Sequence, residues 1–318
     1  MTARIAVAGE NIIDLVPAGD GLLRPLPGGS PANIAAAVAR LGTPASMIAR
    51  ISRDGFGAAI RDRLAADGVR LDLTVDAPEP SSLALVTLDE RARASYTFWV
   101  TGTADWGWRE GELPEPLPGD VCAVHVGSLA VQLEPGGSAL LGLVRRERER
   151  GAVTVSLDPN VRPAIIPDMA RGRRRIEDLV RPSHLVKVSD EDLAHLYPDE
   201  EPVAAARRWL DLGPYLVVLT LGAEGAVAVN AAGEVPVPAP EVRVADTVGA
   251  GDAFMGALLS ALEVRELLGG DRHERLAILD TGPLGEIVEV ANAAAALTCT
   301  RAGAVPPTAE ELTAFLTR

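Results

Sequence analysis

Lysine is almost absent from this 318-residue sequence: Lys187 is the only one, and every other basic residue is arginine. A P-loop of the Walker A type needs a lysine directly after a glycine, where it reaches the β- and γ-phosphates of a nucleotide. Lys187 instead lies in the apolar run Leu-Val-Lys-Val, and the sequence has no protein-kinase catalytic loop. Two common architectures for phosphate transfer are therefore excluded.

Positive charge, cysteine and long apolar runs are also scarce. The net charge is −14, from 30 basic and 44 acidic residues, whereas nucleic-acid binders normally carry a basic surface. Cys122 and Cys299 lie far apart, which argues against a disulfide framework and for a reducing, cytoplasmic setting. No segment approaches the roughly 18 apolar residues of a membrane span. We therefore expect neither a nucleic-acid nor a membrane partner.

Short apolar segments alternate with segments of helical periodicity over most of the chain, which predicts a three-layer α/β fold with a mostly parallel central sheet. The last part, after about residue 250, is helical. The predicted buried strands are Arg4–Ala8, Ala45–Ile51, Val121–Val126, Val153–Leu157, His184–Val188 and Leu216–Thr220.

Two stretches interrupt this alternation and predict a second, smaller sheet. Residues 11–27 and 81–100 read as β-hairpins, the second with β-branched and aromatic strands around a charged turn at 89–91. Neither hairpin has a helical partner. We therefore expect a lid made of residues 11–27 and 81–100 over an α/β core made of residues 1–10, 28–80 and 101–318.

A Gly-Gly pair precedes the first predicted helix. Gly28 and Gly29 are followed by Ser30 as the expected N-cap, by a proline and by Asn33 in the first turn. Such a helix start lets a ligand approach the backbone closely, although a plain tight turn would use the same residues. Asp14 lies within an apolar strand, where it either faces water or accepts hydrogen bonds from vicinal hydroxyls of a sugar.

The segment Asp246–Phe254, DTVGAGDAF, carries the sharpest signal. It follows the strand-like residues Glu241–Ala245 and opens a helix predicted over Gly251–Val264. Its glycines let backbone N–H groups converge at a positive helix end, which forms a hole for a transferring phosphoryl group. Asp252 in the first turn can deprotonate an attacking hydroxyl. A dinucleotide fingerprint is excluded because phenylalanine occupies the place of its last glycine.

These two segments, GGSPANIAAAVARLG at residues 28–42 and DTVGAGDAFMGALLS at residues 246–260, resemble the two signature motifs of the ribokinase-like (PfkB) carbohydrate kinases. The resemblance spans essentially the whole chain. It implies a three-layer α/β core with a β-clasp lid and ATP-dependent phosphorylation of a sugar hydroxyl without a P-loop.

The resemblance also assigns roles to residues around the sugar and the transferred phosphate. Asp252 matches the catalytic base, and Gly249, Ala250 and Gly251 match the anion hole. The sugar-binding positions are matched by Asp14, Gly28, Gly29 and Asn33. In the segment DPNVR, which is similar to one in fructokinases and 2-keto-3-deoxygluconate kinases, Arg162 would point at the substrate or the phosphate. The lid aromatics Phe98 and Trp99 would stack on the sugar, fill a dimer interface or simply pack.

A further set matches the nucleotide and metal side. Thr220, Gly222 and Gly225 lie in a strand–turn–strand that borders the nucleotide, and Asn292 in a helix beside the adenine. Lys187 lies just before the nucleotide and metal shell, with either a structural or a binding role. The carbonyls of Asp246 and Val248, and those of the loop at 301–303, match a potassium region that many relatives use.

Two departures from the family pattern affect the expected chemistry. Ser189 and Asp192 stand where the family often has an asparagine and a glutamate linked to magnesium, and aspartate is one methylene shorter. Val100 stands where many sugar-acid kinases have a lid arginine, the natural partner of a substrate carboxylate. This second departure favours a neutral sugar over 2-keto-3-deoxygluconate.

The sequence therefore predicts a kinase that transfers the γ-phosphate of ATP to a sugar hydroxyl, with fructose as the first-choice substrate. Mg²⁺ is the expected cofactor, K⁺ an optional one, and a homodimer through the lid an expectation from the family. Alternatives are 2-keto-3-deoxygluconate kinase, ribokinase, a nucleoside kinase or, from another class, a catalytically dead sugar- or nucleotide-binding regulator.

Overall fold

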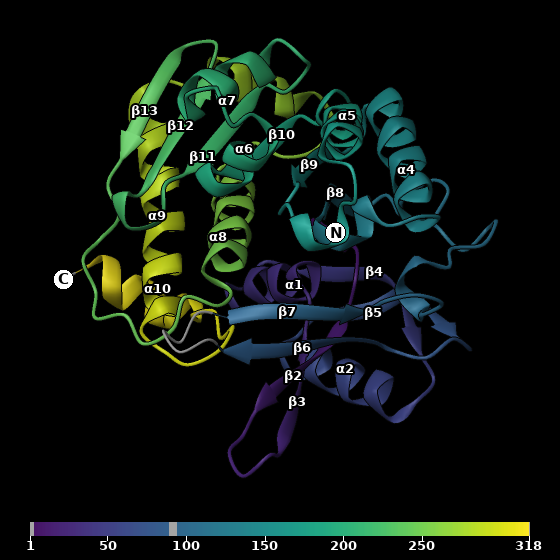
Figure 1. Cartoon of the computed structure of the whole chain (residues 1–318). Helices are drawn as coiled ribbons and strands as arrows, with labels where there is room; N and C mark the ends of the chain where they lie inside the picture. The colour runs from purple at the N-terminus through teal and green to yellow at the C-terminus, as the bar shows by residue number, and fades with distance from the viewer. Residues whose placement is uncertain (1–2, 89–93, 318) are drawn as a thin grey trace.

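A computed structural model describes residues 3–88 and 94–317 of the chain. A nine-stranded sheet runs through the middle of the molecule in the order β13-β12-β11-β10-β9-β8-β1-β4-β5 (Figure 1). The seven strands from β11 to β5 are mutually parallel, whereas β12 and β13 form an antiparallel edge. The strands are β1 Arg4–Ala8, β4 Ala45–Ser52, β5 Arg70–Ala77, β8 Val121–Gly127, β9 Thr154–Asp158, β10 Leu185–Ser189, β11 Leu216–Thr220, β12 Ala226–Asn230 and β13 Gly233–Val237.

Helices cover both faces of this sheet, as Figure 1 shows. One apolar core lies between the sheet and α1 (Ser30–Arg40), α2 (Gly55–Ala66), α8 (Ala250–Val264), α9 (Thr281–Cys299) and α10 (Ala309–Leu316). The other lies beneath α3 (Ser128–Gln132), α4 (Gly136–Arg150), α5 (Met169–Val180), α6 (Asp190–Leu196) and α7 (Pro202–Leu210). The predicted three-layer α/β architecture is confirmed. Within the described ranges, no helix is both long and apolar enough to cross a membrane.

The six strands predicted from apolar runs are all present, because a parallel sheet buried on both faces requires such runs. The strand expected at Glu241–Ala245 is wrong. These residues pair with no strand in the described chain, and Val244 is 59% exposed. Their alternation resembles a strand, but the N–H of Ala245 donates to the carbonyl of Cys299 at the end of α9 instead.

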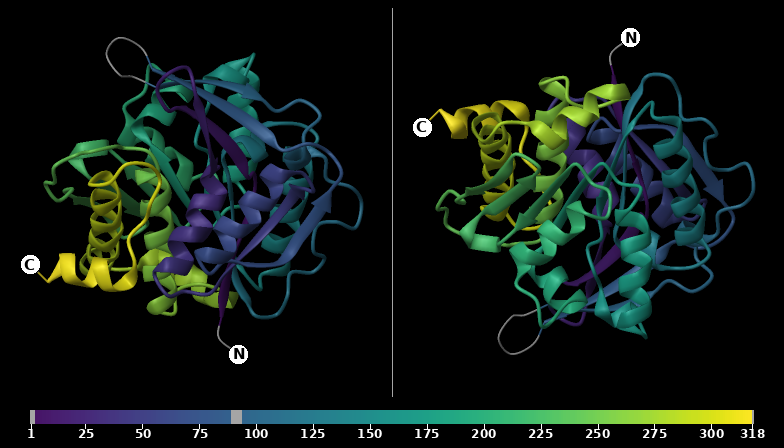
Figure 2. Two further views of the ribbon diagram at one scale, coloured as in Figure 1. Left: turned by 90° about the horizontal axis from the view of Figure 1, so that it is seen from below. Right: turned by 90° about the horizontal axis from the view of Figure 1, so that it is seen from above.

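A second sheet of four strands lies in the lower part of Figure 1, in the order β3-β2-β6-β7. Its strands are β2 Ile12–Pro17, β3 Leu23–Gly28, β6 Ser82–Leu88 and β7 Ala94–Trp99. The two predicted hairpins thus form one sheet, joined by the parallel pairing of β2 and β6. Figure 2 shows the purple β2 and β3 beside the blue β6 and β7. The charged turn predicted at 89–91 lies outside the described residues.

Asp105 ties together three of the chain's connections between the two sheets. Its Oδ1 accepts from the N–H of Asn11, just before β2, at 2.7 Å. Its Oδ2 accepts from the hydroxyl of Ser82, the first residue of β6, at 2.5 Å. Asp105 itself follows β7 and is 3% exposed. Burial raises the pKa of Asp105 to about 6, and the bonds from Asn11 and Ser82 oppose this rise.

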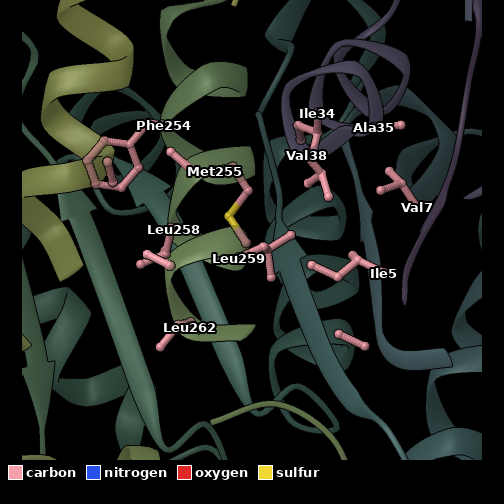
Figure 3. Packing of buried hydrophobic residues seen from close by; sticks show 14 of the residues in the cluster. Ile5, Val7, Ile34, Ala35, Val38, Phe254, Met255, Leu258, Leu259 and Leu262 are labelled. Carbon is pink, nitrogen blue, oxygen red and sulfur yellow. The ribbon is translucent and has the colours of Figure 1, made fainter. Parts of the chain in front are cut away.

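Helix α8 packs closely on α1, and this contact places the start of α8. Figure 3 shows Met255 and Leu259 of α8 directed toward Ile34 and Val38 of α1. A Cβ atom at Gly256 would lie 2.5 Å from the Cβ of Ala37, so the two helices approach more closely than a side chain would allow. The N-terminal ends of both helices therefore meet at one place.

Replacing Asp105 with alanine should lower the free energy of unfolding by about 1–3 kcal/mol, because the buried N–H of Asn11 loses its acceptor. Asp105→Asn keeps one acceptor oxygen and should cost less. Urea denaturation at pH 8 measures both, with Asp178→Ala on the exposed side of α5 as the control. An Asp105→Ala protein as stable as the control would show that Asp105 does not hold the two sheets together.

Candidate active site

The first turn of α8 forms a backbone cradle for an anion. Gly249 is the N-cap residue with φ 78°, a left-handed conformation that favours glycine. A Cβ atom there would also lie 2.6 Å from the Cβ of Ala304. The helix begins at Ala250, one residue before the predicted start. Because the first N–H groups of a helix have no acceptor within it, Gly251 and Asp252 present donors at its positive end.

The carboxylate of Asp252, in this first turn, is held by two residues of α1. Its Oδ1 accepts from the hydroxyl of Ser30 at 2.6 Å, and its Oδ2 accepts from the amide of Asn33 at 2.8 Å. Ser30 was expected to cap α1, and that expectation is wrong. Gly29, with φ 103°, is the N-cap, and Ser30 is the first helical residue, so its hydroxyl is free to reach Asp252.

Asn33 is in turn held by Arg63, which the sequence analysis did not select. Nη2 of Arg63 donates to Oδ1 of Asn33 at 2.8 Å, and its Nη1 donates to the carbonyl of Pro27 at 2.9 Å. Arg63 lies in the last turn of α2, between the two motifs in space but in neither of them in sequence. No local pattern distinguishes it from the neighbouring Arg61.

Asp14 lies against Gly28 of the Gly-Gly pair. A Cβ atom at Gly28 would lie 2.3 Å from Oδ2 of Asp14, so this position has room only for glycine. Burial raises the pKa of Asp14 to about 6, while Arg63 opposes the rise and Asp252 adds to it. The structure thus brings Asp14, Gly28, Asn33 and Asp252 together.

One face of the small sheet carries Asp14 together with aromatic side chains. Asp14 is paired with Ala84 and Ala84 with Phe98 across neighbouring strands, so the three side chains share a face. Tyr96, two residues from Phe98, shares that face and stacks on Phe98 with ring centroids 6.0 Å apart. Burial raises the pKa of Tyr96, and Arg162 on the core opposes this rise, which places Arg162 across from the sheet. The sequence pattern singled out Phe98 and Trp99 in this strand but gave no reason to select Tyr96 as well.

Lys187 is buried beneath the start of α8, where it pairs with a carboxylate at the end of β9. Its Nζ lies 2.9 Å from Oδ2 of Asp158, the last residue of β9, and both side chains are almost fully buried. A Cβ atom at Gly251 would lie 3.2 Å from the same Nζ. Burial alone would lower the pKa of Lys187, but Asp158 and Asp192 outweigh it and raise that pKa. The only lysine therefore lies directly under the anion cradle.

Ser189 and Asp192 form a capping box at the start of α6. Each side chain accepts from the backbone N–H of the other, at 3.1 and 3.3 Å. Oδ1 of Asp192 also accepts from the N–H of Val161 at 2.7 Å. Two of its roughly four lone-pair positions are thus occupied by the protein, and two remain for solvent or metal-bound water. No cluster of three or more acidic, histidine or cysteine side chains suited to a metal occurs among the described residues.

The remaining predicted residues lie around the ends of β11, β13 and α9. Thr220 ends β11, and a short 3-10 turn over Gly222–Glu224 leads into β12, as the strand–turn–strand reading predicted. A Cβ atom at Gly225 would lie 2.2 Å from the carbonyl oxygen of Val237. The amide of Asn292 donates to that same carbonyl at 3.0 Å. The side chain of Asn292 thus holds the backbone at the end of β13 in place.

Asp246 joins the loop before α8 to the loop after α9. Its Oδ2 accepts from the N–H of Gly303 at 2.7 Å, and its Oδ1 accepts from the N–H of Val248 at 3.1 Å. Both carboxylate oxygens therefore serve the backbone. The carbonyl groups of Asp246 and Val248 lie in this same turn, where the sequence analysis expected a monovalent cation.

The arrangement is similar to that of known proteins over the full chain. The family model described as pfkB family carbohydrate kinase matches residues 3–311. A fructokinase of Rhizobium leguminosarum bv. trifolii is 36% identical over 268 residues, which are 83% of this chain and 81% of that protein.

Two solved structures are similar in fold as well. The fructokinase of Xylella fastidiosa with bound ATP has a TM-score of 0.91 and 26% identity, covering 100% of this chain and 99% of that one. The fructokinase of Vibrio cholerae O395 bound to fructose, ADP and calcium has a TM-score of 0.86 and 30% identity, covering 99% of each chain. With both motifs assembled at one end of a fold of this kind, the chain belongs to the pfkB family of carbohydrate kinases.

Proposed function

We propose that this carbohydrate kinase transfers the γ-phosphate of ATP to a hydroxyl of fructose. The observation that carries the proposal is the position of Asp252, which lies in the turn that forms the anion cradle and is hydrogen-bonded to Ser30 and Asn33 of the Gly-Gly helix. An acceptor hydroxyl, a base and a phosphate site thus meet at one point. The relatives named fructokinase, and the solved fructokinases with ATP or with fructose and ADP, support both substrates.

The sugar lies against Asp14 and Phe98, which share one face of the small sheet. Gly28, Gly29 and Asn33 lie beside it, and Arg162 approaches from the core. The carboxylate of Asp14 accepts bonds from vicinal hydroxyls, and the faces of Phe98 and Tyr96 cover the ring. Asp252 takes the proton of the attacking hydroxyl as its oxygen approaches the γ-phosphorus in line with the leaving ADP oxygen. The N–H groups of Gly249, Gly251 and Asp252 stabilise the charge on the transferred group, whereas the N–H of Ala250 donates to the carbonyl of Thr247 at 3.2 Å.

ATP enters as its Mg²⁺ complex along the edge formed by Thr220, Gly222, Gly225 and Asn292. Lys187 supplies positive charge beneath the phosphates, and Ser189 lines the same strand end. Asp192 would hold Mg²⁺ through water, and the metal would supply positive charge to the phosphates. The carbonyls of Asp246 and Val248 would hold K⁺, which lowers the cost of bringing the γ-phosphate close to two carboxylates.

The small sheet, within residues 11–27 and 81–100, acts as a lid. Residues 1–10, 28–80 and 101–318 form the core. Closure of the lid over the sugar excludes water and limits ATP hydrolysis. Trp99 lies on the face opposite to Asp14 and is 50% exposed, which supports pairing of two lids in a homodimer. We place this enzyme in the cytoplasm, in keeping with its free cysteines.

The substrate is tested by measuring ADP release with Mg²⁺-ATP and K⁺ over fructose, ribose, 2-keto-3-deoxygluconate, inositol and adenosine. Fructose should give the highest kcat/KM, since Val100 stands where many sugar-acid kinases have an arginine for a substrate carboxylate. A higher value for another sugar or for the nucleoside would reassign the substrate. Binding of sugar and ATP without turnover of any acceptor would favour a catalytically inactive regulator.

Asp252→Asn should bind ATP and sugar but lose at least ~10²-fold in kcat, because an amide cannot take the hydroxyl proton. The amide can keep a hydrogen bond to Ser30 or Asn33, so the fold should be unchanged. Steady-state kinetics with fructose measures the loss, and isothermal titration with ATP checks binding. Turnover near that of the wild type would contradict a role for Asp252 as the base.

Gly28→Ala should raise the KM for the sugar at least ~10-fold, because its Cβ atom meets the carboxylate that binds the sugar and displaces it. The KM for ATP should stay within about twofold, since the nucleotide edge is distant in the fold. Gly142→Ala in α4, where a Cβ atom meets nothing within 4 Å, is the matched control. Equal sugar KM values in both variants would place the sugar elsewhere.

A further inference from the structure

Arg63 connects three segments of the site through the three nitrogens of its guanidinium group. Nη1 donates to the carbonyl of Pro27, directly before the Gly-Gly pair, and Nη2 donates to Asn33 on α1. Nε lies 3.6 Å from Oδ2 of Asp67, just after α2. The side chain is only 20% exposed. Its planar group is therefore fixed in one orientation.

This orientation determines how Asn33 faces the proposed base. The guanidinium can only donate hydrogen bonds and the ionised carboxylate of Asp252 can only accept them. Asn33 satisfies both partners in one orientation of its amide, with Oδ1 toward Arg63 and Nδ2 toward Asp252. Removing Arg63 would leave that amide free to rotate, and the aim of Asp252 would depend on Ser30 alone.

The positive charge of Arg63 also matters, because the carboxylates of Asp14 and Asp252 both interact with it electrostatically. Burial raises the pKa of Asp14 and the charge of Asp252 adds to this rise, while Arg63 is the cation that opposes it. Arg40 of α1 is directed to Asp67 and to the carbonyl of Pro306 instead. The charged and titratable groups around this position are Asp14 and Tyr96 from the small sheet, Arg40 from α1, Asp67 after α2, Asp158 from β9, Arg162 after β9, Lys187 from β10, Asp192 from α6, Asp246 before α8 and Asp252 from α8.

We propose that Arg63 is a positioning residue for sugar phosphorylation: it orients Asn33 toward Asp252, and it places a fixed positive charge beside the carboxylates of Asp14 and Asp252. The proposal rests on the proposed function, because it assigns Arg63 a part in that reaction. It goes beyond the two motifs, since Arg63 belongs to neither. It makes the sugar site of this chain depend on a side chain from α2.

The kinetic test compares Arg63→Gln and Arg63→Lys with Arg40→Gln. Arg40 is the matched control because it pairs with the same Asp67 but contacts neither Asn33 nor Pro27. Arg63→Gln should lower kcat/KM for the sugar by ~10-fold or more, while the KM for ATP changes by less than about twofold. Arg63→Lys should recover part of this loss, since an ammonium keeps the charge but not the fork that holds two acceptors.

The pH profile separates positioning from general stability. Asp14 must be ionised to accept sugar hydroxyls, so kcat/KM for the sugar should fall as the pH drops through about 6 in the wild type. Without the charge of Arg63 the pKa of Asp14 rises further, and this acid limb should move to higher pH by about half a unit or more in Arg63→Gln. In Arg63→Lys and Arg40→Gln the limb should stay near the wild-type position.

A direct titration keeps this inference distinct from the choice of substrate. The carboxyl ¹³C resonance of Asp14, followed by NMR without substrate, should titrate at higher pH in Arg63→Gln than in wild type. If wild type phosphorylates no acceptor yet this shift occurs, the proposed function fails while the charge role of Arg63 stands. If Arg63→Gln matches Arg40→Gln in sugar kcat/KM, in the acid limb and in the Asp14 titration, the proposal is overturned.

Discussion

The contact of α8 with α1 is the constraint on which the rest of the site depends. Asp252 and the anion cradle belong to α8, whereas Ser30 and Asn33 belong to α1, more than two hundred residues earlier in the chain. Only the close packing of the two helices brings the proposed base within hydrogen-bond distance of the sugar-binding segment. Gly256 makes that packing possible, because a side chain there would collide with Ala37. The catalytic geometry is thus a consequence of core packing.

The acidic character of the chain is resolved locally at this contact. Asp14, Asp158 and Asp252 lie near one another in a protein of net charge −14. Two cations balance these carboxylates: Arg63 from α2 and Lys187 from β10. Backbone N–H groups supply the remaining positive potential, which is how a kinase without a P-loop lysine can still receive a nucleotide phosphate.

The two sheets carry different parts of the proposed site. The large sheet holds the strand ends that carry Asp158, Ser189 and Thr220, and its helices are packed on both faces. The small sheet carries Asp14, Tyr96 and Phe98 on one face, where we propose that the sugar binds. Asp105 joins the two sheets where the chain crosses between them, so one buried carboxylate links the small sheet to the core.

The amino-acid sequence by itself determined the α/β class, the six central strands, the two hairpins and the residues of both motifs, because periodicity, glycine placement and helix-start chemistry are local properties. It misplaced the N-cap of α1 and a strand before α8, where a local pattern had a tertiary explanation. It gave no sign of Arg63 or Tyr96, whose neighbours are also arginine and aromatic. Only the tertiary structure decided which of these side chains meet Asp14 and Asp252, since contacts between distant helices and sheets follow from packing and leave no spacing in the sequence.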